Sequence, residues 1–157
     1  MYKHYEKGEN ISLHDCTIDR IKFKDGWLSL YFGDGFWIDP NHPENDTGMT
    51  LKTDAAKVKF HLVFEDKCDF SVYVLSRKGD YKKCLCTEPK KKNFFERVNS
   101  GNCTLEVLWI YETKYNSLKI IECVIWDKKH PHSDKCFIKL DSDKVKYCWN
   151  ELTGTEY

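Results

Sequence analysis

The sequence predicts a mainly β fold: an antiparallel sandwich or partly open barrel of about 8–10 short strands with one short helix. Short runs of β-branched and aromatic residues alternate with polar residues along most of the chain. Clusters of Gly, Pro, Asn and Asp separate these runs at fairly regular intervals, which is typical of short strands joined by turns. One segment, residues 89–98, has apolar residues at helical spacing, and a glycine follows it to end the helix.

The segment 13–38, LHDCTIDRIKFKDGWLSLYFGDGFWI, contains the clearest local signal, an Asp25-Gly26 turn between two strand-forming runs. A two-residue turn fixes the register, so Lys24 is expected to face Trp27 and Ile21 to face Leu30. One face of this hairpin is then apolar, and the other is basic and aromatic. The apolar set is Ile21, Phe23, Leu28, Leu30 and Phe32, and the opposite set is Arg20, Lys22, Lys24, Trp27, Ser29 and Tyr31.

Two irregularities are expected beside this hairpin. Cys16 and Ile18 are out of phase with Ile21, and a β-bulge near Asp19-Arg20 would return them to the buried face. After the hairpin, residues 33–35 (GDG) form either a second tight turn or a glycine bulge. The two alternatives direct Trp37 to opposite faces.

The rest of the chain is expected to form one domain, 1–157, with an irregular segment at 1–12. Residues 39–48 (DPNHPENDTG) are dense in turn formers and predict a long loop. The runs 57–64 and 70–75 are predicted to pair as a second hairpin, and residues 141–143 are predicted to turn the chain. The remaining expected strands are 81–87, 103–112, 118–126, 136–140 and 145–149.

The charges balance, with 25 basic and 25 acidic residues and a pI near 7.0. This neutrality argues against nucleic acid or an anionic membrane as a partner, since both need a strong positive field. Residues 1–12 contain no apolar stretch typical of a signal peptide, and no window elsewhere would span a bilayer. We therefore expect a cytoplasmic protein.

Eight cysteines are present, and a cytoplasmic location predicts that all of them are reduced. Five of them lie within or beside apolar strand patterns, where a free thiol packs as a small hydrophobic group. These are Cys16, Cys103, Cys123, Cys136 and Cys148.

One set of residues has the chemistry of a metal site. His130, His132 and Cys136 are closely spaced, and Cys84 and Cys86 share a strand face, so together they offer the ligand types of zinc. The simpler interpretation is that the histidines are solvated in a loop, so no metal and no other cofactor is predicted.

His14-Asp15-Cys16 places a thiol beside a base and a carboxylate. Neighbouring strand residues point to alternate faces, however, and a nucleophile and its base normally come from distant parts of a chain. The sequence also has no nucleotide-binding loop and no hydrolase or metalloprotease motif. No catalytic residue is predicted.

The outward face of the first hairpin is the predicted binding surface. Aromatic residues and arginine dominate interface hot spots, and rings beside cations also stack on sugars or bases. The alternative is that this face packs under another layer, with lysine stems covering the rings. The candidate residues are Arg20, Lys22, Lys24, Trp27, Tyr31 and Trp37.

Three stretches, LHDCTI…LSLYFGDGFWI, NSGNCTLEVLWIYE and KYCWNEL, resemble small bacterial β-rich proteins. Some families of similar appearance are immunity proteins or proteins associated with polymorphic toxins. The resemblance implies a cytoplasmic, non-enzymatic protein that binds another protein, and it supplies no catalytic residue.

From these features we predict a non-enzymatic binding protein with a protein partner. The alternative is a small-ligand or carbohydrate binder that uses the mouth of a barrel or the concave face of a sandwich. A metal-binding protein or an enzyme is the third possibility. Nucleic acid, membrane and cofactors are not expected as partners.

Overall fold

Strands β4 (Arg20–Lys24) and β5 (Trp27–Phe32) form the predicted hairpin. Its register is the expected one, with Lys24 opposite Trp27 and Ile21 opposite Leu30. Asp25 and Gly26 have φ angles of 51° and 74°, because the two-residue turn that matches the strand twist needs both central residues in the left-handed region. Asp25-Gly26 therefore sets the pairing that the sequence predicts.

The fold comes from a computed structural model, which describes residues 3–63, 70–75, 81–85, 88–113, 117–128 and 134–156. Around the hairpin, the chain forms the following elements in order: β1 (Lys3–Tyr5), β2 (Ile11–Ser12), β3 (Thr17–Ile18), β6 (Trp37–Ile38), β7 (Leu51–Thr53), β8 (Ala56–Leu62), β9 (Phe70–Leu75), β10 (Tyr81–Leu85), α1 (Glu88–Asn99), β11 (Cys103–Glu112), β12 (Leu118–Asp127), β13 (Asp134–Trp149) and β14 (Leu152–Glu156).

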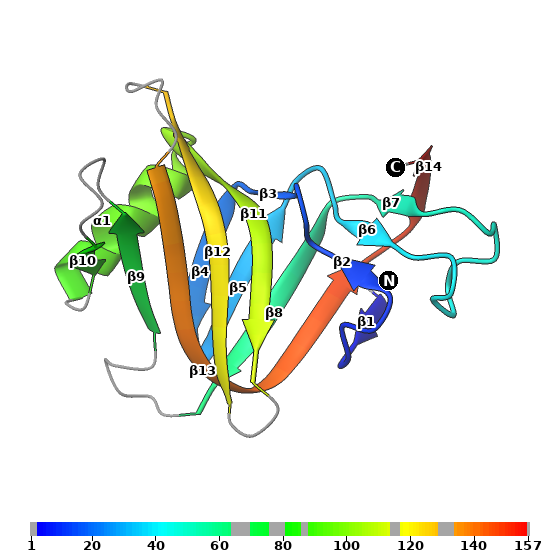
Figure 1. The fold of residues 1–157 in the computed structure, drawn as a ribbon, viewed down its shortest axis with the longest axis horizontal. Coiled ribbons are helices and arrows are strands. Elements are labelled where there is room, and N and C mark those ends of the chain that lie inside the picture. The colour runs from blue at the N-terminus through cyan, green and yellow to red at the C-terminus, as the bar shows by residue number, and fades with distance from the viewer. Residues whose placement is uncertain are drawn as a thin grey trace.

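The long strand β13 divides the main sheet into two layers (Figure 1). The first half of β13 pairs with β12 on one side and β9 on the other. Beyond β12 follow β11 and then β3, and we call these strands the front layer. The second half of β13 pairs with β8 and β1, and β5 and β4 extend this side, the back layer. All of these pairs are antiparallel, so the predicted mainly antiparallel, sandwich-like class with one short helix is confirmed. A separate small sheet has the order β14-β7-β6-β2.

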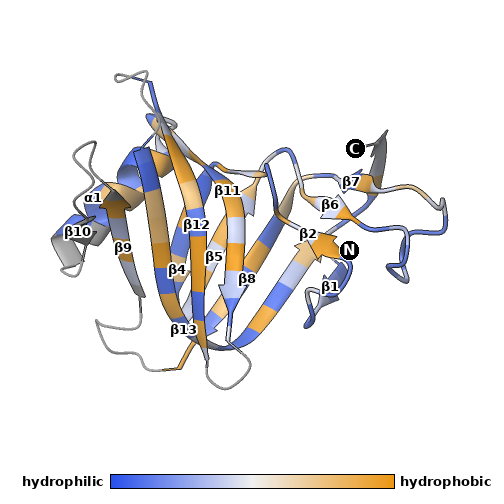
Figure 2. Cartoon of the chain, in the orientation of Figure 1, coloured by the Kyte–Doolittle hydropathy of each residue, from blue (hydrophilic) through white to orange (hydrophobic). Residues whose placement is uncertain are grey.

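The facing sides of the two layers make one core. Hydrophobic and hydrophilic bands alternate along the strands (Figure 2), as expected when one side of each strand is buried. From α1, Phe94 and Val98 join this core, and Gly101 follows the helix with φ 68°. The fully buried large side chains include Leu28, Leu30 and Phe60 in the back layer and Leu105, Ile121 and Ile138 in the front layer. Among the described residues, no helix is long and apolar enough to cross a membrane.

Three expectations about chain order are wrong. The runs 57–64 and 70–75 do not pair with each other, because β8 and β9 each pair with a different half of β13. Residues 141–143 do not turn the chain, since β13 continues through them with a register shift between Ser142 and Lys144. Residues 1–12 contain two short strands, and Tyr5 stacks on Trp149 with ring centroids 5.0 Å apart.

The β-bulge predicted near Asp19-Arg20 is confirmed, since the backbone N–H of Asp19 donates to the carbonyl oxygen of Tyr31, the residue that also lies opposite Arg20. β3 ends before Asp19 and pairs with β11, while β4 begins after it and pairs with β5, so the chain crosses from one layer to the other. Cys16 and Ile18 are both buried as expected. Phe23 is 51% exposed and was expected to be buried. It lies near the end of β4, the outermost strand of the back layer, and among the described strands only β5 pairs with β4.

The second irregularity is a tight turn, since the backbone N–H of Gly35 donates to the carbonyl oxygen of Phe32. The turn places Phe36 and Ile38 in the core and Trp37 half-buried on the other side of β6. A further irregularity lies in β11, where the register shifts between Val107 and Trp109. Trp109 and Tyr111 therefore turn outward, although unbroken alternation would place them beside Leu105 and Val107.

The described cysteines are free thiols, and each is buried. Burial raises the pKa of Cys16 to about 11, and it also raises the pKa of Cys103 and Cys148. A hydrogen bond with Cys136, together with burial, raises the pKa of Cys123. At neutral pH these groups are protonated, and the protonated thiol is the unreactive form.

Thiol titration under denaturing, non-reducing conditions is therefore expected to detect all eight cysteines. In the native protein, at least the five described thiols should react much more slowly with Ellman's reagent than after denaturation. Detection of only a few thiols after denaturation would contradict the reduced state. Fast native reaction of all eight would contradict the burial of these five.

Candidate functional site: a basic sheet face

The outward side of the back layer carries most of the predicted binding residues. Directly opposite residues in neighbouring strands have side chains on the same side of a sheet, so the register defines which residues lie together. Three rows cross β4, β5, β8 and β13, and we call this set the basic face. The rows are Lys24, Trp27, His61 and Lys144; Lys22, Ser29, Lys59 and Lys146; and Arg20, Tyr31, Lys57 and Cys148.

Positive charge dominates the basic face. Seven of its positions hold lysine or arginine and none holds aspartate or glutamate, although the whole chain has no net charge. Two carboxylates border the first row: Asp25, 3.9 Å from Lys24, and Asp143, 2.7 Å from the imidazole Nδ1 of His61. The hydrogen bond with His61 holds the pKa of Asp143 below its ordinary value. The chain as a whole has equal numbers of basic and acidic residues, but folding gathers basic residues on this face without acidic ones among them.

Cations cover the two aromatic rings of the basic face. The Nζ atoms of Lys59 and Lys146 lie 4.8 and 5.6 Å from the ring centroid of Trp27, and the Cζ atom of Arg20 lies 4.6 Å from that of Tyr31. Each such contact stabilises its cation by about 0.5–1 kcal/mol at an exposed site. Trp27 therefore holds two ammonium groups close together, and both rings are only partly available for stacking.

Cys148 lies in the third row and is affected by the same charges. It is 6% exposed, and burial raises its pKa, while Lys57, Lys59 and Lys146 act in the opposite direction. Three ammonium groups are thus near enough to influence one thiol. The effect agrees with the register, which places cations from β8 and β13 around Cys148.

The structure brings five of the six predicted residues together: Arg20, Lys22, Lys24, Trp27 and Tyr31. The part of the basic face that comes from β8 and β13 was not predicted from the sequence. The pattern that could have predicted this part is the alternation of lysine with apolar residues in those two strands. The missed residues are Lys57, Lys59, His61, Lys144 and Lys146.

Trp37 lies elsewhere, in the small sheet. It faces Ser12 and Lys52 across the strands, and the Nζ atom of Lys52 is 5.0 Å from its ring centroid. Trp37 lines a hollow of about 450 Å³ together with Asp39, Thr50 and Trp109. It therefore belongs to a different surface from the basic face.

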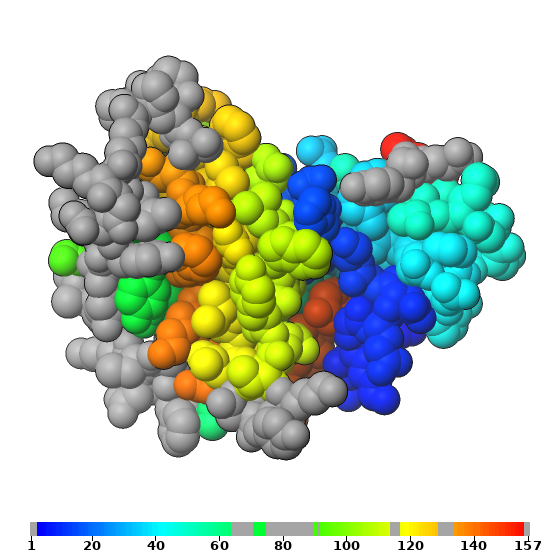
Figure 3. Space-filling model, in the orientation of Figure 1, coloured from blue at the N-terminus to red at the C-terminus, as the bar shows by residue number. Residues whose placement is uncertain are grey.

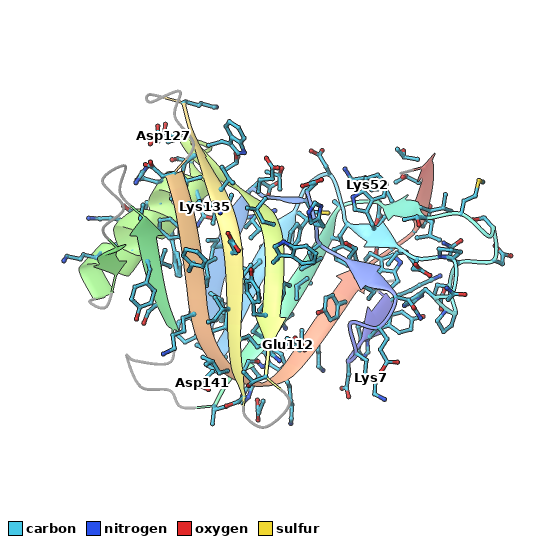
Figure 4. All side chains as sticks on the ribbon, in the orientation of Figure 1. Lys7, Lys52, Glu112, Asp127, Lys135 and Asp141 are labelled. Carbon is cyan, nitrogen blue, oxygen red and sulfur yellow. The ribbon has the colours of Figure 1, made fainter. Side chains whose placement is uncertain are left out.

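This hollow adjoins a larger one of about 860 Å³, and both are lined by Ile11, Ser12, His14 and Trp109. We call the larger one the N-terminal cleft. In Figure 3, β13, drawn in red, is visible at the bottom of a recess between the N-terminal segment in blue and β11 in yellow-green. Lys7 and Glu112 come from these two sides (Figure 4).

The proposed metal ligands are only partly described. Cys86, His130 and His132 lie outside the described residues, as does the side chain of Cys84. Cys136 is buried in the core opposite Cys123. Within the described parts of the chain, no three His, Cys, Asp or Glu side chains are grouped to hold a metal ion.

His14, Asp15 and Cys16 do not form a thiol–base pair. The imidazole Nδ1 of His14 lies 3.0 Å from the carboxylate of Asp15, and both side chains are partly exposed. The Cys16 thiol is buried and donates to the backbone carbonyl oxygens of Ser12 and His14. With a pKa of about 11, this thiol is a poor nucleophile near neutral pH.

Comparison with known proteins gives no relative: no protein-family model, curated protein or solved structure matches the chain.

Proposed function

We propose that the chain is a cytoplasmic, non-enzymatic binding protein that uses the basic face to bind an acidic surface of another protein. The observation that carries the proposal is the cluster of seven cations, without a carboxylate among them, in a chain with no net charge. Complementary charge speeds association and selects among partners. The resemblance to immunity proteins supports the same class of function.

The ring geometry favours a protein partner over single-stranded nucleic acid. Proteins that bind single strands stack successive bases on open aromatic rings. On the basic face, cations cover Trp27 and Tyr31, so the face offers charge rather than stacking. The balanced total charge also gives the molecule little long-range attraction for a polyanion.

The proposal is tested with poly-L-glutamate and a 20-nucleotide oligo-dT as probes, measured by fluorescence anisotropy at fixed ionic strength. The double variant Lys59→Gln/Lys146→Gln removes the two cations over Trp27. We expect it to bind poly-L-glutamate about tenfold more weakly, since exposed charge pairs contribute up to about 1 kcal/mol each.

The matched control is Lys128→Gln/Lys139→Gln, which changes the net charge equally at exposed lysines outside the basic face. It should alter poly-L-glutamate affinity by less than about twofold. Equal losses in the two double variants would overturn the proposal, because binding would then follow net charge alone. Tighter binding of oligo-dT than of poly-L-glutamate would assign the basic face to nucleic acid instead.

A further inference from the structure

Within the described parts of the chain, β11 has an edge in the N-terminal cleft that no other strand covers. On the side away from β12, β3 pairs only with Leu105 and Glu106, and the next residue, Val107, exchanges backbone hydrogen bonds with Asp15 and Cys16. β11 continues to Glu112. Among the described residues, no strand pairs with this last part of β11 except β12.

The pairing pattern shows which backbone groups point into the cleft. The backbone N–H of Val107 donates to the carbonyl oxygen of Cys16, away from β12. Val107 and Cys123 lie opposite each other and therefore exchange no backbone hydrogen bonds. Along an antiparallel ladder, pairs that exchange backbone hydrogen bonds alternate with pairs that do not. After the register shift, the next pair without such bonds is Ile110 and Ile121. The N–H and C=O groups of Ile110 therefore point away from β12, as do those of Glu112 opposite Lys119.

The same rule can be checked on the other edge strand. In the β4–β5 hairpin, it predicts that the backbone of Ile21 points outward. Both of its groups do, since its N–H donates to the side-chain oxygen of Asn99 at 2.8 Å and its C=O accepts from the Asn99 amide at 3.0 Å. An outward backbone pair in this fold is thus available to a partner beside the strand.

The cleft beside this edge has room and a suitable lining. Its volume is about 860 Å³, within the range of ligand-binding clefts, and Ile11, Leu13, Val145 and Tyr147 contribute apolar groups. Trp109 is 60% exposed where the cleft meets the smaller hollow. An extended ligand can therefore lie along β11 and place an apolar side chain beside Trp109.

The charges of the cleft select a peptide rather than a polyanion. Four carboxylates line it, and among the described residues neither Glu6 nor Glu9 forms an ion pair. Three lysines also line it: Lys119 pairs with Glu112 at 3.2 Å, while Lys7 and Lys144 form no ion pair with a described residue. The two signs nearly balance, so a polyanion gains little attraction here, whereas a neutral main chain with side chains of both signs is complementary. On the basic face, by contrast, every lysine or arginine position is cationic and no position holds a carboxylate.

We propose that the N-terminal cleft binds an extended peptide segment of a partner protein, which adds to the edge of β11 as a further strand through the backbone of Ile110 and Glu112. In such complexes the main-chain hydrogen bonds supply affinity and side-chain pockets supply selectivity. The site adjoins the basic face at Asp143 and Lys144, but its strand edge belongs to β11, in the other layer. Isolated strand edges attract other chains, and here the cleft walls restrict access to the edge.

The test begins with displayed random 12-residue peptides selected on the wild-type protein, whose affinities are then measured by fluorescence anisotropy. Ile110→Pro removes a backbone N–H that points away from β12, so no hydrogen bond to β12 is lost. Proline is tolerated in an edge strand at such positions. We expect the selected peptides to bind this variant at least tenfold more weakly. Ile110→Ala keeps the N–H and should change affinity by less than about threefold.

Phe23→Pro is the matched control, since Phe23 lies on the edge strand β4 with its N–H outward and far from the cleft in the strand order. It should bind the peptides as the wild type does, and so should Lys59→Gln/Lys146→Gln, which separates this site from the basic face. Unchanged binding by Ile110→Pro would overturn the proposal. The proposal would also be overturned if no peptide were enriched while free sugars bound and Trp109→Ala weakened that binding. The cleft would then be a small-ligand site.

Amide hydrogen exchange on the wild type provides a measurement that does not depend on the proline variant folding. A bound peptide strand should slow exchange at Ile110 and Glu112 at least tenfold, while Phe23 should be unaffected. Saturation with a selected peptide without slower exchange at Ile110 would also overturn the proposal.

Discussion

Replacement of Leu30 by alanine is expected to lower the free energy of unfolding by about 2–5 kcal/mol. Leu30 is fully buried, and it lies between Ile21 on β4 and Val58 on β8. The substitution removes apolar surface from the core and leaves a cavity, because neighbours on both sides are fixed by the sheet. Urea denaturation should show a lower midpoint with an unchanged slope.

Lys22→Ala is the matched control for this prediction. Lys22 belongs to the same hairpin but lies on the basic face, and substitutions of exposed residues usually change stability by less than about 0.5 kcal/mol. Small and equal effects for the two variants would mean that the register set by Asp25-Gly26 is wrong. In that case the assignment of residues to the basic face would be wrong as well.

Gly35→Ala is expected to destabilise the protein by a similar amount, about 2–5 kcal/mol. Gly35 has φ +75°, a region that costs a residue with a Cβ atom about 1–2 kcal/mol. A Cβ atom here would also lie 2.2 Å from the backbone oxygen of Thr53 and 2.6 Å from that of Asp54. Backbone must move to admit it, at a further cost of about 1–3 kcal/mol.

Gly48→Ala separates the two contributions. Gly48 has φ +76°, but no atom lies within 4 Å of a Cβ atom placed there. This variant should lose only the conformational part, about 1–2 kcal/mol, which corresponds to a fall in Tm of roughly 2–8 °C for a chain of this size. If both variants lost the same stability, the close packing of the 32–35 turn against Thr53 would be contradicted.

Local patterns predicted the fold class and the hairpin because both depend on short-range information. Asp25-Gly26 sets its register within a few residues, and apolar alternation marks the buried side of each strand. The bulge between Val107 and Trp109 gives no comparable signal, since residues 107–111 (VLWIY) are all apolar and no polar position marks a change of phase. Its position depends on the neighbouring strands, which the local pattern does not describe.

The basic face shows the same limit. The cations of β4 were predicted because they share a hairpin with Trp27, but Lys59 and Lys146 reach that ring only through the order β4-β5-β8-β13. Strand order is a non-local property. For this reason the net charge does not show how the charges are distributed, whereas the pairing of distant strands collects cations on one side.

The position of β13 in both layers has a consequence for synthesis of the chain. Strand β8 ends at Leu62, and its partner β13 begins only at Asp134. At about 5–20 residues per second, a ribosome needs several seconds to make the intervening segment. During that time β8 lacks this neighbour, and β12, which is made shortly before β13, also has no partner on that side. The apolar residues of β8 meanwhile have no complete opposing layer. Neither layer closes before β13 leaves the ribosome, so factors that bind nascent strands encounter this chain while both edges are open.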